Sequence, residues 1–256
     1  MNRIQQIFSQ NKKILSVFCT AGYPQLNSLP AILESLEENG VDMVEIGMPF
    51  SDPTADGPVI QHSNTLAINN GMTLDVLFDQ LKNIREKIHI PLVLMGYINP
   101  ALQFGFEKFL QQAHACGIDG IIIPDLPMYE YESMYLPFFQ KYKLENIFLI
   151  TPQTSESRIR KTDSLTNSFI YAVSTHMITG GNVDFNESQQ AYFEKLKNMK
   201  LKNPLIAGFG IRDKQTFDFA TEYLDGAIIG SAFVKAIENT TDLNAGIRKF
   251  IHSIRN

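Results

Sequence analysis

The chain alternates short apolar runs with segments of helical periodicity, and this alternation limits its fold more than any other feature of the sequence. Eight runs rich in β-branched residues, each bounded by Gly, Pro or Asp, are spread along the 256 residues. Their spacing leaves room for one helix between successive strands. The predicted strands are centred on Val17, Val44, Leu94, Ile122, Phe148, Tyr171, Ile206 and Ile228.

Helical periodicity is clearest in two of the intervening segments. Residues 29–36 carry leucine and isoleucine at i, i+3, i+4 and i+7, and Gly40 supplies a stop signal. A second amphipathic helix is predicted to begin after Thr73 and to end before Pro91. Both helices have one apolar face, which is typical of helices that pack on a sheet.

This organisation predicts an α/β protein with a parallel sheet, because strands that alternate with helices pair through right-handed crossovers. Eight such units close most naturally into a single (β/α)8 TIM barrel with extra helices, and one domain over residues 1–256 can hold them. A doubly wound open sheet has the same alternation and stays open as an alternative at this point.

Charge and hydropathy exclude several classes of partner. The net charge is −5 and the basic residues are scattered, so no nucleic-acid footprint is present. No stretch approaches the roughly 18 apolar residues of a membrane span, and the N-terminal residues are too polar for a signal peptide. Cys19 and Cys116 lie far apart in apolar segments, which is typical of a reducing compartment. We therefore expect a cytoplasmic protein with neither nucleic-acid nor membrane partners.

Motifs for metals and nucleotide cofactors are missing from the sequence. The five histidines are dispersed and form no HExxH or paired spacing, so we assign no metal site. Neither GxxxxGK[ST] nor GxGxxG occurs, and no GxSxG elbow suggests a covalent nucleophile. The sequence therefore predicts chemistry that needs no cofactor.

Two carboxylates near the second predicted strand are the candidate acid–base groups. Glu45 lies inside that strand, and Asp56 lies in the long loop behind it, on the side where barrel enzymes carry their active sites. Turn chemistry alone can also explain Asp56 and its neighbour Asp52. A structural ion pair with a buried Lys or Arg can likewise explain Glu45.

Glycine clusters after the sixth, seventh and eighth predicted strands could bind a phosphate dianion through backbone N–H groups. The clusters are Thr179-Gly180-Gly181, Gly208-Phe209-Gly210 and Gly230-Ser231. Tight turns are the alternative explanation for each of them. Together with the two carboxylates, they indicate a small phosphorylated substrate that undergoes proton transfer.

The segment VEIGMPFSDPTADGPVIQ resembles the signature of the tryptophan synthase alpha chain family, and it holds Glu45 and Asp56 eleven residues apart. Further similar segments follow in order, so that the resemblance spans about residues 14–237. They are FCTAGYP, LMGYINP, IIIPDLP, YAVSTHMITG, GFGI and IGSAFV.

The resemblance implies a retro-aldol cleavage of indole-3-glycerol phosphate to indole and glyceraldehyde 3-phosphate. It makes Glu45 the group that protonates indole C3 and helps to deprotonate the side-chain hydroxyl, and Asp56 the group that takes or stabilises the indole N–H proton. Thr179 would belong to a loop that closes over Asp56. The remaining implied contacts are Phe18, Tyr97, Asp125 and Tyr171 at the indole, and Gly180, Gly210, Gly230 and Ser231 at the phosphate.

The resemblance also implies a partner, the pyridoxal-phosphate-dependent beta chain of an α2β2 assembly, which would face the loop after the second strand and residues 103–106. Met177 stands where the family commonly has glycine, which removes backbone freedom from the expected lid. Two alternatives stay open here. One is a non-catalytic allosteric partner subunit, and the other is an unrelated barrel isomerase or aldolase for another sugar phosphate.

Overall fold

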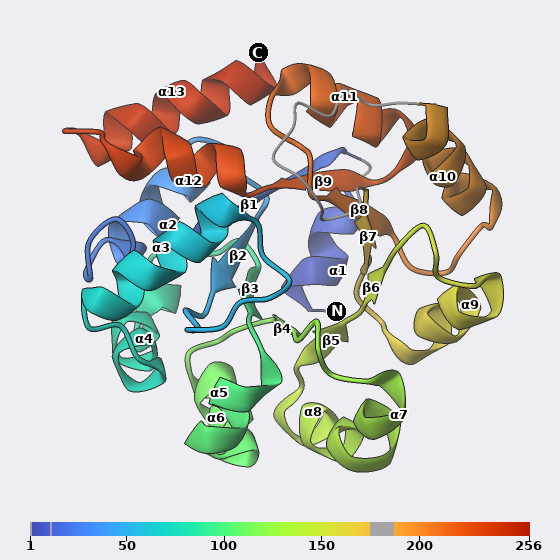
Figure 1. Cartoon of the computed structure of the whole chain (residues 1–256), viewed down its shortest axis with the longest axis horizontal. Coiled ribbons are helices and arrows are strands. Elements are labelled where there is room, and N and C mark those ends of the chain that lie inside the picture. Colours follow the sequence, from blue (N-terminus) through green and yellow to red (C-terminus); the bar gives the residue numbers. More distant parts are fainter. Residues whose placement is uncertain (1, 11, 175–186) are drawn as a thin grey trace.

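The computed structural model describes residues 2–10, 12–174 and 187–256, and it shows a parallel sheet curled into a barrel inside a ring of helices (Figure 1). Neighbouring strands follow the order β5-β4-β3-β2-β1-β9-β8-β7-β6. The strands are β1 (Ile14–Thr20), β2 (Met43–Gly47), β3 (Leu92–Met95), β4 (Gly120–Ile122), β5 (Glu145–Ile147), β6 (Leu149–Ile150), β7 (Ile170–Val173), β8 (Leu205–Gly208) and β9 (Gly226–Ile229). The predicted barrel is confirmed, and the open-sheet alternative is wrong.

The fifth predicted strand is divided at its centre. Phe148 separates β5, which pairs with β4, from β6, which pairs with β7. The Phe148 ring packs edge-on against Tyr131, with ring centroids 5.1 Å apart. Because β5 and β6 are joined through this one residue, the two ends of the strand order meet and the barrel is nearly closed.

The helices lie around the barrel on its outer face, apart from α1, which packs against the interior core at one end (Figure 1). They are α1 (Arg3–Phe8), α2 (Leu29–Glu38), α3 (Pro58–Asn69), α4 (Leu74–Leu81), α5 (Ile98–Phe104), α6 (Phe106–Ala115), α7 (Met128–Glu130), α8 (Leu136–Tyr142), α9 (Glu156–Leu165), α10 (Glu187–Asn198), α11 (Lys214–Tyr223), α12 (Ser231–Glu238) and α13 (Leu243–Arg255), with short helical turns η1 (Ile84–Glu86) and η2 (Tyr131–Tyr135). None of the described helices is long and apolar enough to cross a membrane.

The prediction for 29–36 is confirmed by α2, but the prediction that the next helix reaches almost to Pro91 is wrong. The α4 helix ends at Leu81. The chain leaves the helical conformation at Asn83, with φ −134° and ψ 19°, and continues as η1. The Arg85 guanidinium then donates to the carbonyl oxygens of Ile88 and Ile90 at 3.2 and 2.6 Å, which satisfies two acceptors of the segment that leads to β3.

Strand side chains alternate between two apolar cores. Val44 and Ile46 pack outward in the core between the sheet and the helices, whereas Met43 packs in the core inside the barrel. Because successive strand residues point to opposite faces, Glu45 shares the inward face with Met43 and Gly47. The fold therefore directs one carboxyl group into an apolar interior.

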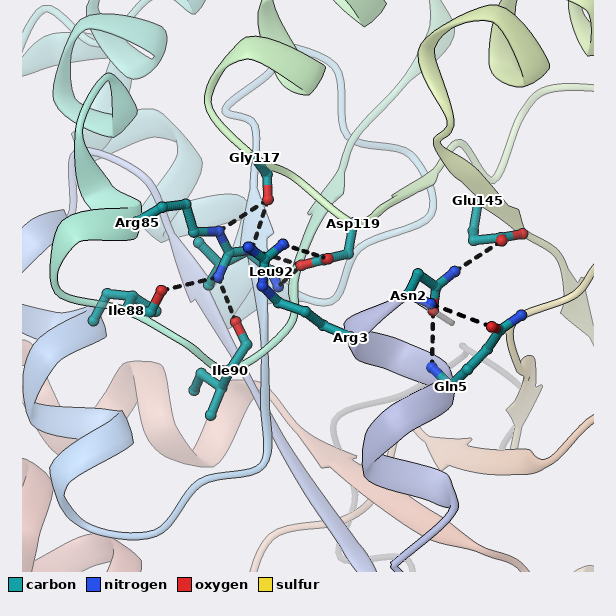
Figure 2. Close-up of polar contacts among 10 residues, drawn as sticks. All are labelled: Asn2, Arg3, Gln5, Arg85, Ile88, Ile90, Leu92, Gly117, Asp119 and Glu145. Atoms are coloured by element: carbon teal, nitrogen blue, oxygen red, sulfur yellow. Dashed lines mark hydrogen bonds and ion pairs between the residues drawn. The ribbon is translucent and has the colours of Figure 1, made fainter.

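The α1 helix closes the end of the barrel where the strands begin. Ile4 and Ile7 join the interior core, and the preceding Asn2 donates to Glu145 at 2.8 Å. Arg3 contacts Asp119, which lies immediately before β4, at 3.0 Å (Figure 2). A ligand can therefore reach the interior from the opposite end, where the strands finish.

Asp119 is the centre of the polar network that holds α1 (Figure 2). Its carboxylate is 4% exposed, pairs with Arg3 and Arg85 at 3.0 and 2.6 Å, and accepts from the backbone N–H of Leu92 at 3.0 Å. These contacts join α1, η1 and the start of β3. Removing one partner of a buried ion pair leaves an uncompensated charge and costs about 3–5 kcal/mol.

We expect Asp119→Ala to lower the melting temperature by about 6–12 °C, because a loss of about 3 kcal/mol shifts a chain of this size by that amount. Asp75→Ala is the matched control, since Asp75 is exposed and its Lys108 contact is 4.0 Å long. Thermal denaturation followed by circular dichroism measures both variants. Equal melting temperatures for the two variants would contradict this role of Asp119.

Candidate active site

Glu45 is a buried carboxyl group without a cationic partner. Its side chain projects from β2 into the barrel, the residue is 2% exposed, and Oε2 has no hydrogen-bond partner among the described residues. Burial, with a smaller contribution from the charge of Asp56, raises the pKa of Glu45 to about 8. The carboxyl is therefore mainly protonated at neutral pH and can act as an acid. The alternative of a structural Glu paired with Lys or Arg does not describe this site.

Asp56 lies in the loop between β2 and α3, at the open end of the barrel. Asn64 of α3 donates to its Oδ2 at 3.5 Å, and Tyr97 also hydrogen-bonds to its side chain. Burial raises the pKa of Asp56 to about 6, and these two hydrogen bonds oppose the rise. Asp56 is thus mainly ionised at neutral pH, when Glu45 is mainly protonated.

The neighbouring Asp52 has the turn role that the sequence also allowed. It is exposed and accepts a hydrogen bond from the hydroxyl of Ser51 at 2.5 Å. Its backbone carbonyl accepts from the N–H of Thr54 at 2.9 Å. The two aspartates of the loop therefore differ, and only Asp56 is directed toward Glu45.

Tyr97 anchors the Asp56 loop. It follows β3, and its hydroxyl accepts a hydrogen bond from the backbone N–H of Ala55 at 2.8 Å. Its ring packs against Phe50 of the same loop, with centroids 5.3 Å apart. Because the hydroxyl also bonds Asp56, one side chain fixes both the backbone and the carboxylate of the loop.

An open pocket lies between Asp56 and the aromatic side chains at the strand ends. It is lined by Phe18, Gly47, Met48, Asp56, Asn64, Met95, Gly96, Tyr97 and Pro124. Most of these groups are apolar, and Asp56, Asn64 and the Tyr97 hydroxyl supply the polar contacts. Such a lining, apolar with a few polar groups, is typical of a small-molecule site.

Phe18 and Tyr171 depend on small residues of neighbouring strands. Phe18 pairs in register with Glu45, and its ring covers Gly47, where a Cβ atom would overlap it. A Cβ atom on Gly208 would overlap the Tyr171 ring in the same way. Tyr171 faces the interior, and burial followed by the charges of Glu45 and Asp56 raises its pKa well above the usual value. The two glycines thus leave room for the rings beside the carboxyl groups.

Asp125, which the resemblance places at the indole, lies outside the lining of this pocket. Its Oδ1 accepts from the backbone N–H of Ile98 at 2.9 Å, at the first residue of α5. The carboxylate therefore stabilises the helix start directly after Tyr97. The charge of Asp125 also contributes to the raised pKa of Tyr97, after burial and the charge of Asp56.

Two of the three glycine clusters belong to the described residues. Gly210 follows Phe209 after β8, and both have positive φ angles, of 80° and 64°. Gly230 is the N-cap of α12 and has no side chain to cap it, so no side chain among the described residues caps the first-turn N–H groups, from Ser231 onward, which are a candidate anion site. Thr179, Gly180 and the departure at Met177 lie outside the described residues.

Gly230 places the start of α12, the candidate anion site, close to the aromatic side chain of Phe18. A Cβ atom at Gly230 would lie 3.5 Å from Cβ of Phe18. Phe18 thus stands between Glu45, its partner in register, and the start of α12. A molecule with a ring at one end and a phosphate at the other could contact both regions.

The sequence did not indicate Asn64, and it named Phe209 only as a member of a glycine cluster. Asn64 lies on the buried face of α3 at 4% exposure, and its position eight residues after Asp56 was the available signal. Phe209 adopts a left-handed backbone conformation and packs edge-on to Tyr171 with centroids 6.0 Å apart. A bulky residue between two glycines does not reveal such a conformation in advance.

No group of three or more His, Cys, Asp or Glu side chains suited to a metal ion occurs among the residues that the structure describes. The groups that can act chemically are Asp56 and the Tyr97 hydroxyl in the pocket lining, with Glu45 beside the pocket on the strand next to Phe18, and the backbone N–H groups at the start of α12. This combination in a parallel barrel defines the class: an enzyme that moves protons on a small phosphorylated substrate.

Comparison with known proteins identifies the family. The family model described as tryptophan synthase alpha chain matches residues 4–255. The alpha chain of Flavobacterium johnsoniae is 54% identical over 255 residues, covering 100% of both chains, and that of Bacteroides thetaiotaomicron is 50% identical with 100% coverage of both. The chain belongs to the tryptophan synthase alpha chain family.

Solved structures agree with this assignment. The alpha subunit of Legionella pneumophila superposes with a TM-score of 0.89 at 31% identity, covering 100% of this chain and 97% of that one. A chain of Mycobacterium tuberculosis tryptophan synthase gives a TM-score of 0.86 at 26% identity, covering 99% and 98%. The chain is therefore a carbon–carbon lyase of tryptophan biosynthesis that cleaves indole-3-glycerol phosphate. The alternative of an unrelated barrel for another sugar phosphate is wrong.

Proposed function

We propose that Glu45 and Asp56 perform the proton transfers of indole-3-glycerol phosphate cleavage in this chain. The observation that carries the proposal is the difference between their environments. Glu45 is mainly protonated at neutral pH because it is buried without a cation, whereas hydrogen bonds keep Asp56 mainly ionised. Two carboxyls with separated pKa values supply one acid and one base in the same pocket.

The reaction begins with proton transfer to the ring. Protonated Glu45 gives its proton to indole C3 while Asp56 takes the ring N–H proton, which forms the indolenine tautomer. Glu45, now a carboxylate, removes the proton from the hydroxyl on the carbon attached to C3. The carbon–carbon bond then breaks toward the ring, and the nitrogen recovers its proton from Asp56. Indole and glyceraldehyde 3-phosphate leave, and both carboxyls return to their starting states.

Aromatic and main-chain groups would bind the two ends of the substrate. The indole ring would lie against Phe18, Tyr97 and Tyr171, with Asp125 supporting Tyr97 from the start of α5. Thr179, by resemblance, would belong to the loop that closes over Asp56. The phosphate would be bound by backbone N–H groups at Gly180, Gly210, Gly230 and Ser231, with the positive end of the α12 dipole near it.

The partner in this proposal is a tryptophan synthase beta chain in an α2β2 assembly that receives indole in the cytoplasm. The loop after β2 and residues 103–106 are the proposed contact surface. Leu102 of α5 supports it, since this large apolar side chain is 46% exposed beside that segment. Adding a beta chain to the purified protein would test both the pairing and its effect on indole release.

Glu45→Gln and Asp56→Asn should each lower the turnover of indole-3-glycerol phosphate at least about 100-fold, because each removes one proton-transfer group. The assay is indole release by the purified chain alone. Asp52→Asn is the control within the same loop and should keep near wild-type turnover. Near-normal turnover in a folded Glu45→Gln or Asp56→Asn variant would remove that residue from the mechanism. Failure of the wild-type chain in the same assay would favour the non-catalytic partner subunit.

The dependence of kcat/KM on pH should be bell-shaped, with its maximum at about pH 7. Below a pH of about 6 the pKa of Asp56 makes this base neutral, and above a pH of about 8 the pKa of Glu45 makes this acid ionised. Both changes lower the rate. A profile that rises once near pH 4.5 and then stays flat would contradict the protonation states assigned to the two groups.

A further inference from the structure

Ser174 connects the end of β7 with the turn after β8. The residue is 1% exposed, and its backbone N–H donates to the carbonyl oxygen of Gly208 at 3.0 Å. Its hydroxyl lies 2.9 Å from the same oxygen and also contacts the carbonyl oxygen of Phe209. The Ser174 carbonyl in turn accepts from the side chain of Gln189 at 3.1 Å. Ser174 is therefore fixed on both of its sides.

The hydroxyl has one proton and two carbonyl oxygens within reach. The carbonyl oxygen of Gly208 already accepts a hydrogen bond from the Ser174 backbone N–H. We therefore assign the hydroxyl proton to the carbonyl oxygen of Phe209. The φ of Phe209 is 64°, which is strained for a residue with a Cβ atom, so a hydrogen bond to its carbonyl group helps to hold this conformation. The Ser174 hydroxyl thus stabilises the left-handed conformation of Phe209.

The left-handed conformation of Phe209 determines which groups of the Gly208–Phe209–Gly210 turn can contact a ligand. The Phe209 ring packs edge-on to Tyr171 at 6.0 Å, with 61° between the ring planes. Gly210 follows with a φ of 80°, so its backbone N–H takes its direction from the Phe209 backbone. A shift of Phe209 would therefore move an aromatic contact and a main-chain donor together.

We propose that Ser174 is a positioning residue, which acts through the Phe209 carbonyl to set the Gly208–Phe209–Gly210 turn for binding the phosphate end of the substrate. The inference rests on the proposed function, which assigns phosphate binding to Gly210. Within the described part of the chain, the Ser174 hydroxyl bonds only to the Gly208–Phe209 turn and does not contact Glu45 or Asp56, so it affects substrate binding and leaves proton transfer unchanged.

Ser174→Ala tests the inference, with Ser168→Ala as the matched control. Ser168 precedes β7, is 3% exposed, and has a hydroxyl without a hydrogen-bond partner among the described residues. We expect Ser174→Ala to raise KM roughly 5- to 20-fold, as the loss of one well-placed buried hydrogen bond does, with kcat within about twofold of wild type. The dependence of kcat/KM on pH should remain bell-shaped in Ser174→Ala. Ser168→Ala should have the wild-type KM, kcat and pH dependence.

Glycerol 3-phosphate is the second probe, because it carries the phosphate without the indole ring. Its dissociation constant, measured by calorimetry, should rise in Ser174→Ala by the same factor as KM. Unchanged KM and unchanged glycerol 3-phosphate binding would overturn the inference, as would a fall in kcat with KM unchanged. The calorimetric result tests Ser174 even where the wild-type chain releases no indole, an outcome that would refute the proposed function alone.

Ser174→Cys covers the case in which the alanine variant does not fold. The thiol keeps nearly the same volume and is a weak donor, so the carbonyl of Phe209 still loses its strong hydrogen bond. We expect a raised KM and a raised glycerol 3-phosphate dissociation constant in this variant also. Wild-type values in folded Ser174→Cys would contradict the role of the hydroxyl proton.

Discussion

A carboxyl group buried without a cation is the constraint on which the rest of this site depends. Moving an ionised carboxylate into an apolar interior is costly, and a group in that position keeps its proton instead. The sealed end of the barrel, where α1 packs beneath the interior core, helps to keep water away from Glu45. The same polar network that holds α1 thus contributes to an acid that remains protonated at neutral pH.

Asp56 shows how a second carboxyl can be kept in the opposite state a short distance away. It lies on a loop rather than on a strand, and Tyr97 and Asn64 donate hydrogen bonds that stabilise its charge. The loop itself is fixed through Ala55 and the ring of Phe50, both of which contact Tyr97. Tyr97 therefore determines where the base lies as well as how easily it ionises.

Local pattern predicted the features that depend on periodicity. Strand alternation was enough to place Glu45 on the same face as Met43, and strand spacing was enough to predict a parallel α/β sheet, although the open-sheet alternative was excluded only by the structure. The remaining features of the fold depend on contacts between residues that are far apart in the sequence. Arg85 holds the segment between α4 and β3, and the break between β5 and β6 coincides with the packing of Phe148 on Tyr131.

The residues of the candidate site also fall into those that the sequence indicates and those that only the structure reveals. The two carboxyls and the glycine clusters could be named from the chain because they lie in or after predicted strands. Asn64, the strained Phe209 and the support that Asp125 gives to α5 needed coordinates, since each depends on a partner from another element. Sequence named the groups that we propose react, and the fold showed which residues hold them.

The stability difference between Glu45→Gln and wild type, followed with pH, tests the central claim most directly. The unfolded chain ionises Glu45 near its usual pKa of 4.5, whereas in the folded chain its pKa is about 8. Stability of the wild type therefore falls as pH rises between these values, and glutamine carries no such penalty. The melting temperature of Glu45→Gln should match the wild type near pH 4 and exceed it by a growing margin up to about pH 8. A difference that does not change with pH would contradict a buried, neutral carboxyl at the centre of this barrel.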